Sequence, residues 1–192
     1  MVEHILKDEL NKKHTQLKFL FVGTFNPDIE SNNVEPKYFY SRNSFWCILP
    51  HALGEQCLVD KGKKEWGDFC DIHNIGLIDL IESLKDADKN TDFESEKYSD
   101  KKLESLGPLF ITTRIKEIIN TNSETLRGVF FTRSTVTGEI GKQWKEIEKH
   151  CKTFNPKIYT QPLLTPSLRK TTIKKAIANW KEAITSSMPS AS

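Results

Sequence analysis

The stretch Leu17–Gly23 reads Leu-Lys-Phe-Leu-Phe-Val-Gly, an apolar run of strand-forming residues that a glycine ends. Nearly continuous apolar runs are typical of strands in parallel sheets, where helices cover both faces. The run therefore predicts the first and central strand of a parallel sheet. Ligands of such sheets bind beyond the carboxyl ends of the strands, so residues 23–27 form the first candidate loop.

The remaining chain alternates between helical and strand patterns, which favours one α/β domain over residues 1–192. We expect a three-layer α/β/α sandwich with a short, mostly parallel central sheet. The apolar strip 75–81 predicts a loop running into a helix, and the charged segment 85–102 predicts a solvated surface. The other expected elements are an N-terminal helix within residues 1–14, helices near 44–49, 63–70, 111–119, 140–151 and 173–184, strands at 128–132 and 157–160, and a flexible tail at 187–192.

Composition narrows the class of protein. The 192 residues include 28 basic and 26 acidic side chains, a net charge of +2, which is too balanced to indicate nucleic-acid binding by bulk charge. The sequence has no apolar stretch of the ~20 residues that a membrane helix needs, and no apolar signal core near its start. We therefore expect no membrane partner. The sequence also has no CxxC pair or dense cysteine pattern, so we expect a cytoplasmic protein with reduced thiols and no metal site. The four cysteines are Cys47, Cys57, Cys70 and Cys151.

The loop after the first strand carries polar groups that suit a ligand. Gly23 lets the chain turn sharply and lets a ligand approach the backbone, and the Asn26 amide could hold a water molecule against an electrophilic carbon. A turn in which Asn26 hydrogen-bonds the backbone explains the same residues. The loop alone leaves both interpretations open.

The aromatic segment 38–46 could hold a planar base between its rings, because base–aromatic stacking contributes about 1–3 kcal/mol per base. Phe45 and Trp46 are better explained as core residues. For Tyr40 and Asn43, contact with a base and a purely structural role, such as a helix cap, remain equally open.

A second candidate loop, residues 164–170, precedes the last helix. Backbone amides at a helix N-terminus suit a phosphate, and Arg169 and Lys170 add positive charge. Leu168 could wedge between base steps. A helix cap beside solvated lysines is the structural alternative.

Four motifs in this order resemble the uracil-DNA glycosylase superfamily, and most closely its mismatch-specific and hypoxanthine-DNA glycosylase branches. They are Gly-Thr-Phe-Asn-Pro at 23–27, Tyr-Ser-Arg-Asn-Ser-Phe-Trp at 40–46, Ile-Gly-Leu-Ile-Asp-Leu-Ile at 75–81, and Thr-Pro-Ser-Leu-Arg at 165–169. The Asn-x-Phe-Trp part is the most specific of them. The resemblance implies the fold of that superfamily and a monofunctional DNA glycosylase acting in base excision repair.

By this resemblance, the enzyme would flip a deaminated base, uracil or hypoxanthine, out of DNA and hydrolyse its N-glycosidic bond. Asn26 and Asn43 would be the catalytic candidates that position water. Phe39 or Tyr40 would stack on the base. Backbone contacts to the base would come from Gly23, Thr24 and Phe25.

The resemblance also implies how DNA is held. Ser167 would contact a phosphate, while Leu168 and Arg169 would fill the gap left by the flipped nucleotide, with Lys170 beside them. The expected partner is DNA containing a damaged or mismatched base. No cofactor is implied, and we expect a monomer.

Two other functions fit the same residues. One is a catalytically inactive module of the same fold that binds nucleic acid or a nucleobase. The other is an α/β protein outside repair that binds nucleotides or hydrolyses nucleosides. Abasic product from DNA would separate the enzyme from the module, and turnover of free nucleosides without DNA binding would favour the third function.

Overall fold

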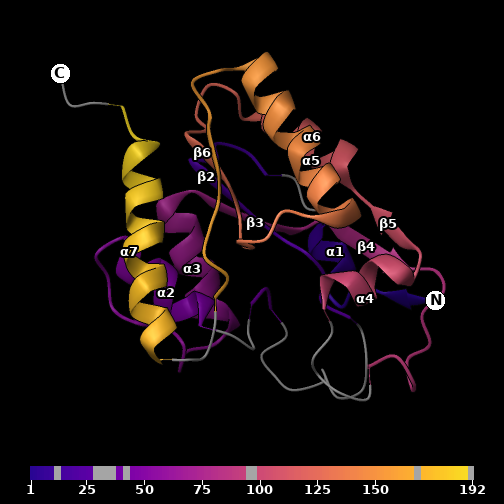
Figure 1. Cartoon of the computed structure of the whole chain (residues 1–192). Coiled ribbons are helices and arrows are strands. Elements are labelled where there is room, and N and C mark those ends of the chain that lie inside the picture. The colour runs from indigo at the N-terminus through magenta and orange to yellow at the C-terminus, as the bar shows by residue number, and fades with distance from the viewer. Residues whose placement is uncertain (11–13, 28–37, 41–43, 94–98, 167–169, 190–192) are drawn as a thin grey trace.

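A computed structural model describes residues 1–10, 14–27, 38–40, 44–93, 99–166 and 170–189 (Figure 1). Its strands are β1 (Val2–Glu3), β2 (Phe19–Gly23), β3 (Ile75–Asp79), β4 (Ile81–Leu84), β5 (Pro108–Phe110), β6 (Gly128–Phe131) and β7 (Tyr159–Pro162). Its helices are α1 (Lys7–Leu10), α2 (Phe45–Ala52), α3 (Lys63–His73), α4 (Asp100–Ser105), α5 (Thr112–Thr121), α6 (Gly138–Phe154) and α7 (Lys170–Ser186). No helix among these residues is both long and apolar enough to cross a membrane.

The central sheet has the strand order β3-β2-β6-β7, and all neighbouring strands are parallel. This order confirms that β2 is an inner strand. The register aligns Gly23 with Asp79 and Val22 with Phe131. The carboxyl ends of β2, β3 and β6 therefore lie side by side at one edge of the sheet, which is called the carboxyl edge below.

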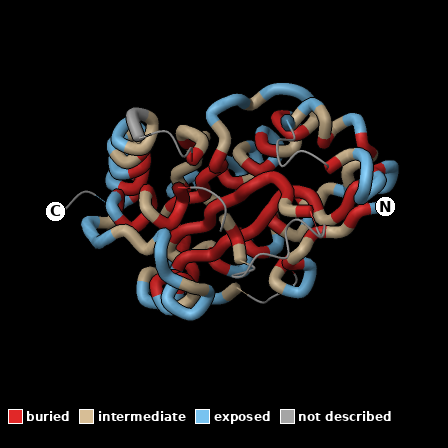
Figure 2. The backbone as a smooth tube through the Cα atoms, turned by 90° about the horizontal axis from the view of Figure 1, so that it is seen from below, coloured by how far each residue is buried: buried red, intermediate tan, exposed pale blue. Residues whose placement is uncertain are grey.

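Helices cover both faces of this sheet, with α2, α3 and α7 on one side and α5 and α6 on the other (Figure 1). Successive strand residues point to opposite faces, so alternate aromatic residues serve the two layers. Phe21 packs on Phe45 of α2 and Trp180 of α7, whereas the Phe131 ring stacks on Trp144 of α6. The strands β2, β3 and β6 are buried between the layers, whereas β7 is half-buried (Figure 2). The expected three-layer α/β architecture is confirmed, while the single-domain expectation stays a prediction.

A second, antiparallel sheet with the order β1-β4-β5 corrects two expectations from the sequence. The N-terminal segment is not a helix throughout, because Val2 and Glu3 pair with β4 and only the four residues of α1 are helical among those described. The strip 75–81 is not a loop entering a helix, because it contains β3 and the start of β4. Apolar spacing alone does not separate a buried strand from a helix segment of this length.

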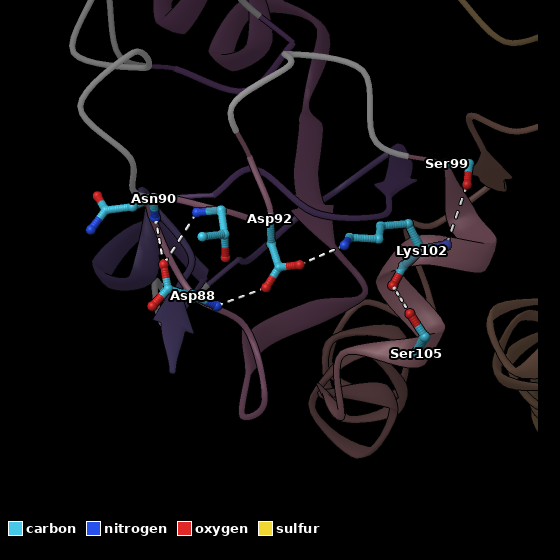
Figure 3. Close-up of polar contacts among 7 residues, drawn as sticks. Asp88, Asn90, Asp92, Ser99, Lys102 and Ser105 are labelled. Carbon is cyan, nitrogen blue, oxygen red and sulfur yellow. Dashed lines mark hydrogen bonds and ion pairs between the residues drawn. The ribbon is translucent and has the colours of Figure 1, made fainter.

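The charged segment 85–102 is mostly exposed among its described residues, as expected for a solvated surface, and part of it closes an ordered turn. The Asp88 carboxylate accepts hydrogen bonds from the backbone N–H groups of Asn90 and Thr91, and Asp92 accepts from Lys102 of α4 (Figure 3). Phe93 beside this turn is buried. The polar side chains therefore close a turn that holds an aromatic ring in the core.

Two boundaries near the C-terminus also differ from the sequence prediction. The last strand begins two residues later than expected, at Tyr159, because the Ile158 N–H closes a turn onto the Asn155 carbonyl. The expected flexible tail begins too early, because Ser187 is buried and its hydroxyl donates to the Ile184 carbonyl. Residues 190–192 lie outside the described residues.

Candidate functional site at the carboxyl edge of the sheet

The site is centred on Gly23, the last residue of β2. A β-carbon at this position would lie 2.0 Å from Oδ1 of Asp79 and 2.7 Å from the hydroxyl oxygen of Tyr40. Both distances are far below van der Waals contact. Glycine at the end of the central strand thus allows a carboxylate and a phenol to lie directly over the backbone.

Asp79 is held in place by His4, which lies between β1 and α1. His4 Nδ1 accepts the Leu6 backbone N–H at 3.0 Å, so the ring proton is on Nε2 and the imidazole is neutral. Nε2 then donates to Asp79 Oδ2 at 2.7 Å. The His4 side chain is 0% exposed and that of Asp79 is 7% exposed, so the pair is shielded but not sealed from solvent.

Sequence analysis missed both members of this pair. For Asp79 there was a signal, because it is the one charged residue within the apolar strip 75–81 and it falls at the end of a parallel strand. For His4 there was none. A single histidine in an N-terminal segment gives no indication that it reaches a carboxylate 75 residues away.

Tyr40 reaches the same place from the segment that precedes α2. Its backbone is left-handed, with φ of 58°, and its ring stacks on Phe45 at a centroid distance of 4.0 Å. The Thr132 hydroxyl lies 3.4 Å from the Tyr40 hydroxyl oxygen. Burial, and then the negative charge of Asp79, raise the pKa of Tyr40 well above its usual value of 10. Tyr40 is therefore a neutral phenol beside the carboxylate.

Arg133 supplies a cation at this edge. It is the second residue after β6 and follows Thr132, the residue whose hydroxyl lies near that of Tyr40. One guanidinium nitrogen, Nη2, donates to Thr24 Oγ1 at 2.8 Å and lies 3.1 Å from the Asp100 carboxylate. The next residue, Ser134, donates its N–H to Thr165 Oγ1 at 3.3 Å. These contacts join the loops that follow β2, β6 and β7, and sequence analysis did not single out Arg133.

Other predicted site residues lie around His4. The Phe25 and Phe39 rings are buried, with centroids 5.6 and 6.0 Å from the His4 ring. Asn26 is half-buried, and its main-chain carbonyl accepts the N–H of Ile5. The carbonyls that end β2 are used in the same way, because those of Gly23 and Thr24 accept the N–H groups of residues 80 and 81. The stacking and water-positioning roles expected here stay predictions.

The structure does not describe the remaining predicted residues. Asn43, Ser167, Leu168 and Arg169 lie outside the described residues, and Lys170 is known only as the first residue of α7. Of the residues expected to meet in one site, Gly23 and Tyr40 lie beside Asp79, while Phe25 and Phe39 lie beside His4. Thr24 contacts Arg133. Within the described part of the chain, no three His, Cys, Asp or Glu side chains are grouped so that they could hold a metal ion.

Comparisons with known proteins add little to this geometry. No family model matches the sequence, and no curated protein matches it. Among solved structures, a solution NMR structure described as a "putative Uracil DNA glycosylase" from Methanosarcina acetivorans is similar. It shares 17% sequence identity with a TM-score of 0.48, over 90% of this chain and 92% of that chain. A likeness at this level assigns no activity to the chain and no role to its residues.

Proposed function

We propose that this protein is a monofunctional DNA glycosylase that hydrolyses the N-glycosidic bond of a flipped-out deaminated base, uracil or hypoxanthine. One observation carries the proposal. At the carboxyl edge, loops bearing glycosylase-like motifs bring a shielded carboxylate, Asp79, and a neutral phenol, Tyr40, over the bare backbone of Gly23. A base that has left the DNA stack needs a site of this kind, with polar groups shielded from bulk water.

The chemistry asked of the protein is modest. As the glycosidic bond breaks, the sugar acquires positive charge, which a nearby carboxylate stabilises, and an oriented water then attacks C1′. No covalent nucleophile is needed. Asn43 and Asn26 remain the candidates that orient the water. We further propose that the partly exposed Arg133 contacts a phosphate.

The first prediction tests the activity itself. Purified protein is incubated with oligonucleotides carrying uracil, hypoxanthine or mismatched bases, in single and double strands, and abasic sites are detected by alkaline cleavage. We expect product from at least one deaminated base. If Asn43 orients the water, Asn43→Ala should lower the rate on the order of 10²-fold, as removal of one transition-state hydrogen bond commonly does.

The matched control for that variant is Asn120→Ala. Asn120 is an exposed asparagine of α5, and its side chain contacts His150 of α6. It should keep the parent rate. DNA binding without abasic product for any base would contradict the proposal and favour the inactive module. Turnover of free nucleosides without DNA binding would favour the third function.

The second prediction concerns the loop before α7. Replacing Arg169 and Lys170 by alanine should weaken DNA binding, and should reduce the slope of log K against log salt by roughly one for each phosphate that is no longer neutralised. Binding is measured by fluorescence anisotropy at several salt concentrations. The control replaces Lys152 and Lys157, which flank the opposite end of β7, and removes the same charge. Equal salt slopes for the two double variants would show that this loop does not contact DNA.

A further inference from the structure

We propose that Asp79 is the proton acceptor for the attacking water, and that His4 is the positioning residue that fixes the Asp79 carboxylate. This inference rests on the proposed function. It gives roles to Asp79 and His4, two residues to which the motif resemblance assigned none. It starts from the contacts of the His4–Asp79 pair over Gly23.

Proton balance requires such a group. In the hydrolysis, the water oxygen bonds to C1′ of the sugar, the N-glycosidic bond breaks, and its electron pair leaves with the base. The water must then give up a proton. The amides of Asn26 and Asn43 can orient the water, but an amide has no basic site that takes a proton near neutral pH.

Two carboxylates are described at this edge, and they differ in their partners. Asp100 forms an ion pair with Arg133 at 3.1 Å, so its negative charge is balanced by the guanidinium. Among the described residues, the Asp79 carboxylate is hydrogen-bonded to a neutral ring and forms no ion pair with a lysine or an arginine. Asp79 is thus the better placed of the two to accept a proton.

The two oxygens of Asp79 have separate tasks in this arrangement. Oδ2 accepts the His4 Nε2 proton, and Oδ1 lies over the α-carbon of Gly23. Within the described residues, no side chain or backbone N–H donates to Oδ1. A carboxylate held through one oxygen can present the other to water in a fixed direction, which is how residues behind an active site orient the groups in front of them.

His4 is itself anchored, so that it can act as a fixed donor. The Leu6 N–H holds Nδ1, and the rings of Phe25 and Phe39 lie beside the imidazole. The surrounding apolar rings exclude water that would compete for the hydrogen bond between Nε2 and Asp79. The neutral tautomer supplies direction without adding a positive charge to the site.

The test begins with Asp79→Asn, which keeps the size of the side chain and an oxygen that accepts from His4 but removes the proton acceptor. We expect kcat for base release to fall about 10²–10⁴-fold, the usual contribution of a general base, with KM nearly unchanged. Melting temperature and affinity for lesion-bearing DNA are measured alongside. Asp68→Asn, an exposed aspartate of α3, is the matched control and should keep the parent kcat.

The role of His4 is tested with two variants of different donor capacity. His4→Phe keeps a ring among Phe25 and Phe39 but loses the donor, whereas a glutamine can place an amide N–H near the position of Nε2. We expect His4→Phe to lower kcat at constant KM and His4→Gln to restore much of it. In the Asp79→Asn background, His4→Phe should cause little further loss of kcat, because the two residues act as one unit.

Three outcomes would overturn the inference. If Asp79→Asn releases base at the parent rate, Asp79 is not the proton acceptor. If His4→Phe lowers kcat equally in both backgrounds, or if His4→Phe and His4→Gln are indistinguishable, then His4 is only structural. If the parent protein releases no base from any lesion, the proposed function fails and this assignment fails with it, which distinguishes that case from the first two.

Discussion

Gly23→Ala is expected to remove most of the base-releasing activity and to lower the free energy of unfolding by about 1–3 kcal/mol, the usual cost of overpacking. The added β-carbon would stand 2.0 Å from Asp79 Oδ1 and 2.7 Å from the Tyr40 hydroxyl. The carboxylate cannot simply rotate away, because His4 holds its other oxygen. Since a misplacement of about 1 Å can cost on the order of 10²-fold in rate, a loss of that size or larger is expected in a single-turnover assay.

The matched control is Gly67→Ala in α3, where a β-carbon would meet no atom within 4 Å. Alanine is favoured over glycine inside a helix by roughly 0.5–1 kcal/mol, so this variant should be slightly more stable and fully active. Parent-like activity and stability of Gly23→Ala would contradict the placement of Asp79 and Tyr40 over the central strand.

Phe21→Ala is expected to destabilise the fold by about 3–5 kcal/mol, the range observed when a buried phenylalanine is truncated. Phe21 is 0% exposed in β2, and its ring lies against those of Phe45, Phe130 and Trp180. Its removal would leave a cavity between the sheet and the layer formed by α2 and α7. Because domains are typically stable by only about 5–15 kcal/mol, equilibrium unfolding in urea should show a large shift of the midpoint.

Phe154→Ala at the end of α6 makes the same chemical change on the surface, because Phe154 is 48% exposed. It should alter the free energy of unfolding by no more than roughly 0.5–1 kcal/mol. Similar unfolding midpoints for the two alanine variants would show that the layer of α2 and α7 does not pack on β2 as described.

The fold was predictable because its signals are local. The apolar run of β2 and the 3.6-residue spacing of apolar side chains in α5, α6 and α7 can be read within one segment. Where the sequence prediction was wrong, at residues 1–14 and 75–81, a short apolar stretch was compatible with both a strand and a helix. The pairing of Val2 with Leu84 shows that the N-terminal stretch is a strand, and these two residues are 82 positions apart in the chain.

The candidate site was only half predictable. The loop that begins at Gly23 was located correctly at the carboxyl edge, because a parallel strand followed by a helix places its loop there. Asp79 could have been suspected as the charged end of an apolar strand. Nothing in the sequence pointed to Arg133 as the partner of Thr24, since the two are 109 residues apart.

By itself, the sequence determined the parallel sheet around β2, the helices that cover it and the edge at which a ligand would bind. Only the tertiary structure decided which side chains meet at that edge, above all His4 with Asp79 over Gly23. The physical reason is that secondary structure follows from hydrophobic spacing within a segment. Contacts between distant residues depend instead on strand register and on the path of the loops, which that spacing does not specify.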